Sequence, residues 1–258
     1  MATGRQPPQH PKLRDNTTVN IYRDEAIVLR TQKLGEADRI ITMLTRRHGK
    51  IRAVGKGVRR TKSKFGSSLE PFTHIDLQCY AGRELDIVTQ AQILVSYNAV
   101  TGSYPHYTAA TAMLETADRF TEEREPALRV FLLLSGGLKA LHAGAHDASM
   151  VLDAFVLRTL AISGYAPGLD ECARCGAAGP HLSFHIPSGG TVCPDCRPTG
   201  CASPAPESIA LMSALLEGDW AYADASERRY QREASGLVSA YLEWHLDRRL
   251  RSLQLVER

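Results

Sequence analysis

The chain has 258 residues, 43% of them hydrophobic and 23% charged, a composition typical of a globular protein with room for two modest domains. No apolar run approaches the ~18 residues that a membrane span needs, and the N-terminus lacks the apolar core of a secretory signal, so we expect a cytoplasmic protein without a membrane partner. The net charge of +3 is uneven, because residues 1–66 hold 16 Lys and Arg against 5 Asp and Glu, which favours an anionic partner for this part.

The first part of the chain is predicted to be a tail followed by a small β-barrel. Residues 1–19 are rich in Pro, Gln and Thr and are expected to be disordered. Residues 20–97 contain five predicted strands, at 22–30, 38–46, 51–57, 72–80 and 85–95, with a loose segment at 58–70. Five short strands in this length favour an OB-fold, although an SH3-like barrel has a similar strand count.

After residue 97 the apolar periodicity changes from two to 3.6, which predicts helices. The expected helices span 108–121, 126–142, 147–163, 206–218 and 226–253. They form a helical bundle in two parts, 98–166 and 205–258, on either side of an insertion at 167–204. The predicted fold class is therefore α+β and multi-domain, with a five-stranded OB-fold barrel before the bundle.

The insertion at 167–204 has too few large apolar residues to form a core, and its cysteine spacing predicts a metal site. Two C-x2-C pairs are separated by 17 residues, a spacing typical of a zinc ribbon with one structural Zn²⁺. The predicted ligands are Cys172, Cys175, Cys193 and Cys196. Two disulfides or four buried thiols are the alternatives, and His181 or His185 could replace one cysteine. Of the remaining two cysteines, Cys79 is expected in the strand core and Cys201 has no pairing partner.

A basic stretch without any acidic residue runs from 50 to 64, and two further cations flank the first predicted turn. Such a surface binds nucleic acid by neutralising phosphates, so affinity should fall steeply with salt. The predicted DNA contacts are Lys33, Arg39, Lys50, Arg52, Lys56, Arg59, Arg60, Lys62 and Lys64, with Phe65 as a stacking surface. Phe65 and Phe72 fit a barrel core equally well. A solvated basic face, or a patch for an acidic protein, is the alternative.

Catalytic motifs are absent from the sequence. We find no phosphate-binding loop, no G-x-G-x-x-G, no G-x-S-x-G and no H-E-x-x-H. The acids near the predicted strands that could hold magnesium for a nuclease, without a compact arrangement, are Glu70, Asp76, Glu84 and Asp86. We therefore expect no enzyme activity.

Two segments resemble the bacterial RecO family. YRDEAIVLRTQKLGEADRIITMLTRRHGKIRAVGKGVRRTKSKFGSSLEPF, which starts at Tyr22, is similar to its N-terminal signature. FVLRTLAISGYAPGLDECARCG, which starts at Phe155, is similar to the stretch that leads into the family's zinc site. The resemblance covers roughly residues 22–253, and the tail before it is a departure from the family pattern. Some family members lack the cysteines, so zinc is not required for the family's function.

The resemblance implies a DNA repair and recombination mediator associated with the nucleoid. Such a protein binds single- and double-stranded DNA, anneals complementary strands and, with RecR, helps load RecA onto DNA coated by single-strand-binding protein (SSB). The helical body would hold the acidic C-terminal tail of SSB, and the candidate contacts are either Arg228, Arg229 and Arg232 or Arg248, Arg249 and Arg251. The competing hypotheses are a zinc-ribbon interaction module that does not bind DNA, and a metal-dependent nuclease.

Overall fold

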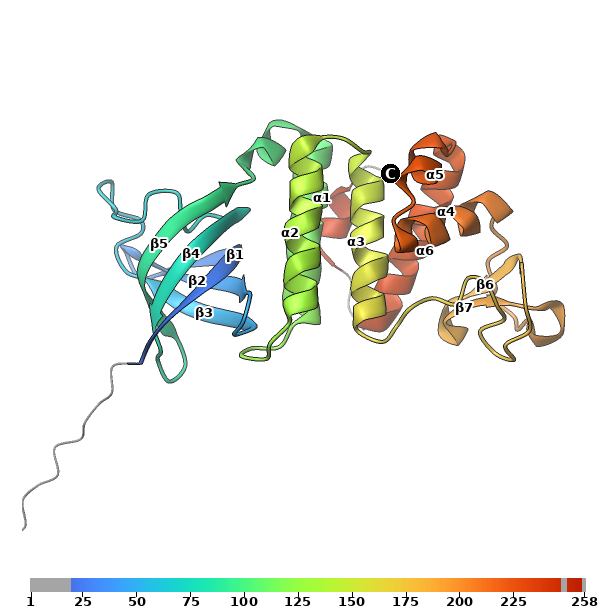
Figure 1. Ribbon diagram of the computed structural model, residues 1–258, viewed down its shortest axis with the longest axis horizontal. Coiled ribbons are helices and arrows are strands. Elements are labelled where there is room, and N and C mark those ends of the chain that lie inside the picture. Colours follow the sequence, from blue (N-terminus) through green and yellow to red (C-terminus); the bar gives the residue numbers. More distant parts are fainter. Residues whose placement is uncertain (1–19, 247–249, 257–258) are drawn as a thin grey trace, which may run out of the picture.

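The computed structural model describes residues 20–246 and 250–256, and it shows three parts in a row along the long axis of the molecule (Figure 1). A β-barrel occupies one end, helices fill the middle, and a small two-stranded ribbon lies at the other end. The tail predicted for residues 1–19 lies outside the described residues. None of the described helices has the length and apolar character needed to cross a membrane.

The barrel closes in the order β1-β2-β3-β5-β4. Its strands are β1 (Ile21–Leu34), β2 (Asp38–Thr45), β3 (Lys50–Gly55), β4 (Thr73–Tyr80) and β5 (Asp86–Ser96). All pairs are antiparallel except β3 with β5, which closes the barrel through a short parallel contact. The long strand β1 pairs with both β2 and β4. This five-stranded Greek-key closure confirms the OB-fold and excludes the SH3-like alternative.

Side chains on β1 and β2 alternate between two cores. Ile41 and Met43 point into the barrel, where they join a cluster that also includes Val28. Ile27 and Leu44 belong instead to the core of the helical body. Because successive residues of a strand face opposite sides, one pair of strands fills the barrel and also gives the helices an apolar surface to pack against.

The helical body contains six α-helices within the described ranges. They are α1 (Tyr104–Phe120), α2 (Leu128–Ala143), α3 (Ala148–Ile162), α4 (Pro206–Glu217), α5 (Trp220–Ala225) and α6 (Arg228–Leu246). Helix α3 is buried along most of its length and packs against α1, α2, α4 and α6. Two short 3-10 helices, η1 (Asn98–Gly102) and η4 (Ser252–Leu255), flank the body. The short helix α5 was not predicted.

One predicted helix is wrong at its C-terminal end. The sequence predicts a continuous helix over 226–253, but α6 is described as far as Leu246, and Leu253 lies in the separate turn η4. Residues 247–249 lie outside the described residues. In η4, both the backbone N–H and the hydroxyl of Ser252 donate hydrogen bonds to Glu115 of α1, at 3.0 and 2.5 Å. A contact with another helix therefore fixes this segment.

The insertion forms a small β-ribbon of β6 (Ser183–His185) and β7 (Gly190–Val192), with the 3-10 turns η2 (Ile186–Ser188) and η3 (Pro194–Cys196). It joins the body between α3 and α4. Phe184 belongs to the core of the helical body and contacts Tyr241 of α6, with ring centroids 5.9 Å apart. The Tyr241 hydroxyl also donates to the carbonyl of Gly189 at 3.4 Å, and Leu169 and Ile186 pack against the same core. These contacts attach the ribbon to the body, while its polar interior must be held by other means.

Candidate nucleic-acid interface and metal centre

The segment between β3 and β4, residues 56–72, forms a loop that is anchored inside the barrel. We call it the basic loop. Its apolar side chains Val58, Phe65 and Leu69 are buried in the barrel core. Successive backbone hydrogen bonds of 3.0–3.4 Å, from Arg60 to Gly57, Ser63 to Arg60 and Gly66 to Ser63, give it a regular series of turns. The loop therefore covers one end of the barrel in a fixed shape.

Close packing of the loop against β3 explains the glycine at position 55. A Cβ atom on Gly55 would lie 2.5 Å from the Cγ2 atom of Val58, which is shorter than real carbon contacts. The absence of a side chain lets the chain fold back over the end of the barrel. The apolar anchors then point inward, and the charged side chains between them must point to solvent.

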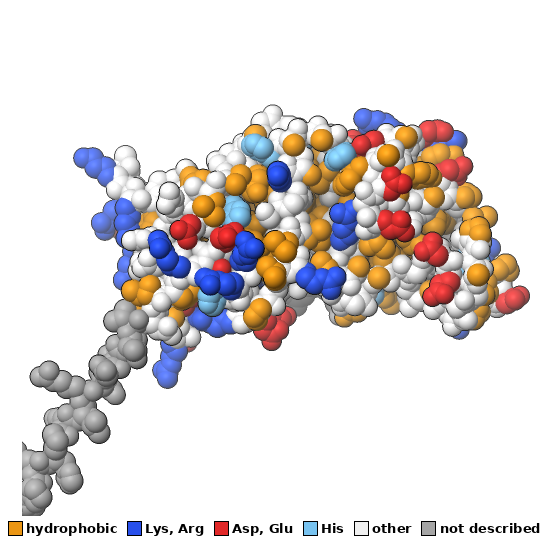
Figure 2. Space-filling view, in the orientation of Figure 1, with side chains coloured by type: hydrophobic (Ala, Val, Ile, Leu, Met, Phe, Trp, Pro, Cys, Tyr) orange, Lys and Arg blue, Asp and Glu red, His pale blue; other side chains and the backbone are white. Residues whose placement is uncertain are grey.

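Four cations at this end of the barrel have exposed side chains that form no hydrogen bond or ion pair with any described residue. They are Lys33, Lys56, Arg60 and Lys62. Figure 2 shows Lys and Arg side chains projecting from the barrel end of the molecule. These four cations are the predicted DNA contacts whose charge the fold leaves available.

Three further predicted contacts lie at this end, and two of them also serve the loop itself. Arg59 donates to the carbonyl oxygens of Gly35 and Glu36, at 3.2 and 2.9 Å, and thereby ties the loop to the β1–β2 turn. Lys64 donates to the carbonyl of Thr89 at 3.1 Å. Both side chains are exposed. The Arg59 guanidinium and the Lys64 ammonium keep their positive charge, because a carbonyl oxygen carries no opposite charge to neutralise it.

Arg39 is the third of these contacts, but an acid neutralises it. Its Nη1 atom lies 2.6 Å from a carboxylate oxygen of Glu70. Glu36, Asp38 and Glu70 are the acids in this region, against the seven cations Lys33, Arg39, Lys56, Arg59, Arg60, Lys62 and Lys64. The loop end therefore keeps a positive excess.

The prediction that Phe65 provides a stacking surface is wrong. Its side chain is 3% exposed and packs in the barrel core, with the Lys64 ammonium 4.8 Å from the ring centroid. A base would have no open ring face to stack on. The apolar spacing of Val58, Phe65 and Leu69 in an otherwise polar segment is the signal that identifies them as anchors.

Lys50, another predicted DNA contact, is engaged within the protein. Its side chain is 13% exposed, and its ammonium lies 2.6 Å from the carbonyl oxygen and 3.2 Å from the carboxylate of Asp118 on α1. Arg30 of β1 donates to the carboxylate of Asp118 at 2.8 Å. Burial alone would raise the pKa of Asp118, but the hydrogen bond from Arg30 and the Lys50 charge hold it below its usual value. Lys50 therefore joins the barrel to the helices.

Arg52 lies next to this junction. It is half-buried, and its guanidinium is 3.8 Å from Glu123 in the α1–α2 connection. Close by, Gly49 has a φ of +69°, and a Cβ on it would lie 1.8 Å from the carbonyl oxygen of Glu125. The start of β3 thus packs directly against the helical body, and the Arg52 guanidinium lies at this junction.

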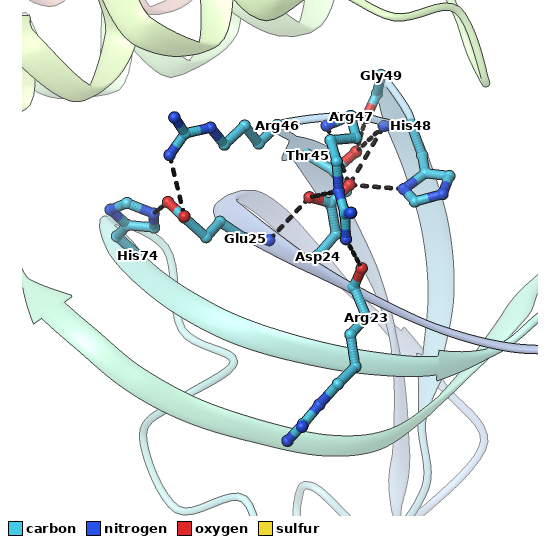
Figure 3. Close-up of polar contacts among 9 residues, drawn as sticks. All are labelled: Arg23, Asp24, Glu25, Thr45, Arg46, Arg47, His48, Gly49 and His74. Atoms are coloured by element: carbon cyan, nitrogen blue, oxygen red, sulfur yellow. Dashed lines mark hydrogen bonds and ion pairs between the residues drawn. The ribbon is translucent and has the colours of Figure 1, made fainter.

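At the opposite end of the barrel, acids hold the cations of the β2–β3 turn (Figure 3). The side chain of Asp24 is 1% exposed and accepts hydrogen bonds from the backbone N–H groups of Arg47 (3.0 Å) and His48 (3.2 Å), and it lies 2.6 Å from the Nδ1 atom of His48. Burial alone would raise the pKa of Asp24, but these bonds from His48 and Arg47 hold it below its usual value. The carboxylate therefore fixes the turn.

The neighbouring cation is paired in the same way. Arg46 lies 3.0 Å from Glu25, and Glu25 also lies 3.2 Å from His74. Both contacts appear in Figure 3. Free positive charge is therefore concentrated at the basic-loop end of the barrel, and not around its whole circumference.

The four predicted metal ligands come together in the ribbon. The Sγ atoms of Cys172, Cys175, Cys193 and Cys196 all lie within 4.8 Å of one another, and those of Cys175 and Cys193 are 3.8 Å apart. A tetrahedron with Zn–S bonds of ~2.3 Å places its sulfurs about 3.8 Å apart. The donor set and its spacing therefore fit one tetrahedral metal ion.

The backbone around the cysteines favours thiolates. The N–H of Cys193 donates to the Sγ of Cys172 at 3.4 Å, and this bond is the largest of several hydrogen bonds that together lower the pKa of Cys172 to about 6. Hydrogen bonds with Cys175 and Cys193 raise the pKa of Cys196 to about 12. Since neighbouring thiolates repel one another, a divalent cation is the group that would let all four ionise.

The other candidate ligands lie outside this cluster. His181 contacts the carbonyl oxygen of Ala177 at 2.9 Å, and His185 contacts the hydroxyl of Ser188 at 2.7 Å. Cys201 donates to the carbonyl of Pro198 at 3.3 Å. Cys79 is buried in the barrel, as predicted, and burial raises the pKa of its thiol to about 12.

The acids of the nuclease hypothesis do not form a metal site. Among the described residues, the four cysteines are the one group of three or more potential ligands close enough to share an ion. Asp86 is fully buried and accepts hydrogen bonds from Tyr22, Gly82 and Arg124 at 2.5, 2.9 and 3.0 Å. Glu70 is paired with Arg39. These two carboxylates have structural partners.

An OB-fold barrel with a basic loop, joined to a helical body with a four-cysteine ribbon, defines a class of multidomain OB-fold proteins. Comparison with known families identifies the member of that class. The family model described as "Recombination protein O N terminal" matches residues 19–97, and "Recombination protein O C terminal" matches residues 102–254. The chain belongs to the RecO family of DNA repair proteins.

Relatives support this assignment over nearly the full length. The chain is 61% identical to the DNA repair protein RecO of Thermobifida fusca, over 93% of this chain and 100% of the relative. It is 56% identical to the DNA repair protein RecO of Streptomyces griseus, over the same shares. It is 58% identical to that of a Nocardioides species, over 92% of this chain and 100% of the relative.

Proposed function

We propose that this chain is a recombination mediator that holds DNA by the exposed cations of the basic loop and its neighbours. It binds single- and double-stranded DNA, anneals complementary strands and, with RecR, helps load RecA onto SSB-coated single strands. The observation that carries the proposal is the excess of unpaired positive charge on an anchored loop at one end of the barrel. Its DNA partner would place the protein at the nucleoid in the cytoplasm.

The chemistry of the loop suits phosphate better than base edges. Lys and Arg side chains attract the backbone of any sequence, and contacts to phosphate carry no sequence information. Annealing needs this kind of contact, because base edges that a protein does not occupy remain free to pair with a second strand. A loop that grips the backbone and leaves the bases accessible therefore supports the annealing role.

The protein partners rest on the family. For the acidic SSB tail, two of the described candidates, Arg228 and Arg232, line a hollow of about 420 Å³ between α3 and α6, together with Gln231, Ser149 and the acid Asp147. Arg248 and Arg249 lie outside the described residues. We propose this hollow as the place to test for the tail, while RecR and, indirectly, RecA follow from membership of the family alone.

We further propose that the four cysteines bind one structural Zn²⁺. Sulfur ligands fill all four positions of a tetrahedron and leave no place for a reactive water. The residues bring the sulfurs together and orient backbone N–H groups toward them, and the ion supplies the cross-link that the polar ribbon lacks. The proposed DNA surface lies at the opposite end of the long axis (Figure 1).

Charge reversal on the loop tests the DNA-binding proposal. We expect the triple variant Lys56→Glu, Arg60→Glu and Lys62→Glu to lose most of its affinity for a labelled single strand. The slope of log affinity against log salt should become shallower by about two, because each lost phosphate contact removes about 0.7 from it. Fluorescence anisotropy at several salt concentrations measures both quantities.

The matched control reverses three exposed cations elsewhere, Arg83, Arg129 and Lys139, which also lack a partner among the described residues. It carries the same change in net charge and should lose much less affinity. Equal losses in both triple variants would mean that only the overall charge matters. Wild-type protein that does not bind the strand even in dilute buffer would favour the interaction-module hypothesis instead.

A further inference from the structure

The barrel lacks an exposed aromatic ring next to the basic loop. Proteins that bind single strands without sequence preference combine a basic surface with aromatic rings on which bases stack. Of the barrel aromatics, Phe65, Phe72 and Tyr97 are buried. Tyr22 lies at the start of β1 and Tyr80 at the end of β4, and these two strand ends pair with each other away from the loop. A stacking surface for this site must therefore come from outside the barrel.

Two exposed tyrosines lie directly after the barrel. Tyr104 and Tyr107 belong to the first turn of α1, and their side chains are 54% and 42% exposed. Residues three positions apart lie on the same side of a helix. Figure 1 places η1 and the start of α1 on the same upper side of the molecule as the basic loop. The two rings thus form one aromatic surface near the loop.

A hollow connects this surface to the barrel. It measures about 320 Å³, and Pro71 and Phe72, at the end of the basic loop, line it together with Tyr107. The Tyr107 ring contacts Phe72 edge-on, with centroids 5.8 Å apart and an interplanar angle of 67°. This contact holds the Tyr107 ring in place while leaving much of it open.

The charges around the hollow favour an anionic strand on its open side. Thr31 of β1 lines the hollow, and Lys33, two residues further, projects from the same face of the strand. Lys33 has no partner among the described residues. The two acids of the far wall have basic partners, since Asp118 pairs with Arg30 and Glu115 lies 4.0 Å from Arg119. A free ammonium therefore lies beside an aromatic surface.

We propose that Tyr104 and Tyr107 form the stacking surface for the bases of a single strand whose phosphates bind the basic loop. The hollow beside Tyr107 accepts one base, and Lys33 contacts an adjacent phosphate. The inference rests on the proposed function, because it assigns bases to a surface next to the proposed phosphate contacts. Stacking on tyrosine does not discriminate between bases, in keeping with a mediator that acts on any sequence.

Abasic DNA separates stacking from phosphate binding. Wild type, the double variant Tyr104→Ala and Tyr107→Ala, and the control Tyr222→Ala are titrated with an oligothymidylate and with an abasic strand of equal length. Tyr222 is an exposed tyrosine on α5. We expect the double variant to bind oligothymidylate roughly tenfold more weakly or worse, with an unchanged salt slope, and to bind the abasic strand as wild type does. The control should match wild type with both strands.

Each alternative outcome is distinct. Unchanged affinity of the double variant for oligothymidylate overturns the inference and leaves the loop proposal intact. An equal loss with both strands also overturns it, since the tyrosines would then act without bases. Tyr104→Ala alone, at the more exposed position, shows whether a loss follows from misfolding, and thermal unfolding of each variant checks the fold. Wild-type protein that binds neither strand removes the proposed function and this inference together.

Discussion

At the scale of single residues, Phe65 shows how an apolar side chain can serve a charged surface. It lies between the exposed Lys62 and Lys64 on one side and the buried Leu69 on the other, and it fills the barrel interior. Removal of a buried aromatic ring leaves a cavity and usually destabilises a protein by about 3–5 kcal/mol. Phe65 would therefore support the proposed DNA contacts through the shape of the loop and not through a base contact.

We predict that Phe65→Ala lowers the free energy of unfolding by about 3 kcal/mol, whereas Phe65→Leu loses much less, because leucine still fills the core. Urea denaturation measures both values. Phe65→Leu should also keep its single-strand affinity within about twofold of wild type, since the loop keeps its anchor. Ser67→Ala, at an exposed position of the same loop, is the control. A large loss of DNA affinity in a fully stable Phe65→Leu variant would restore the stacking role.

Residue roles were the hardest feature to predict from the sequence. Lys50 and Lys56 look alike in the basic stretch, yet Lys50 is paired with Asp118, which lies 68 residues away, and Lys56 is free within the described part of the chain. Only tertiary structure separates them. The four cysteines could be identified because two C-x2-C pairs carry their geometry in local spacing.

At the scale of elements, the β2–β3 turn depends on one buried carboxylate. Asp24 accepts bonds from the N–H groups of Arg47 and His48, and the His48 N–H also donates to the Thr45 hydroxyl at 3.0 Å. The pKa of Asp24 in the folded protein lies below the ordinary value. Ionised Asp24 thus stabilises the fold at pH values above its unfolded pKa of about 3.9, and this contribution is lost as the pH falls through the lower folded pKa.

We predict that Asp24→Asn lowers the free energy of unfolding at pH 7 by about 1–3 kcal/mol, as expected when charged hydrogen bonds in a buried site are removed. The difference from wild type should stay constant down to about pH 5 and shrink below about pH 4. Urea denaturation between about pH 3 and pH 7 measures it. Asp76→Asn is the control, because Asp76 is 40% exposed and 3.9 Å from Arg23. A difference that grows in acid would contradict the assignment.

Element boundaries followed partners more than local propensity. The predicted first strand ends at residue 30, but β1 continues to Leu34, because β2 pairs with it as far as Asp38. The leucine stripe that predicted a helix to 253 correctly identifies Leu250 and Leu253 as buried. It gave the wrong element for Leu253, because a 3-10 turn that packs on a helix can bury the same residues.

At the scale of the whole molecule, the four-cysteine cluster and the basic loop lie at opposite ends (Figure 1). We predict one zinc ion per chain and its loss in Cys172→Ser, with loosening of residues 167–204 and a barrel that stays folded. Metal analysis of protein purified anaerobically, together with hydrogen exchange, measures both effects. Cys201→Ser should keep its zinc, because Cys201 lies outside the four-sulfur cluster. Wild-type protein without zinc would contradict the prediction.

The order of barrel, helices and cysteine ribbon could be predicted from the sequence, because each part has its own periodicity or composition. The way the parts join could not. Lys50, Arg30 and Asp118 form their junction from three elements that are distant in the sequence, and no local pattern brings them together. Composition also does not reveal that acids pair with the cations of the β2–β3 turn. For this reason the uneven charge of residues 1–66 did not show which end of the barrel is basic.

The anchored loop also affects how much conformational entropy a DNA strand loses when it binds. Since Val58, Phe65 and Leu69 already hold the loop in the free protein, the backbone positions that carry its cations are set before any ligand arrives. The loss of conformational freedom on binding then falls mainly on the flexible polymer, because the receptor is preorganised. A mediator whose binding loop is preorganised can release one strand and bind another without refolding between the two events.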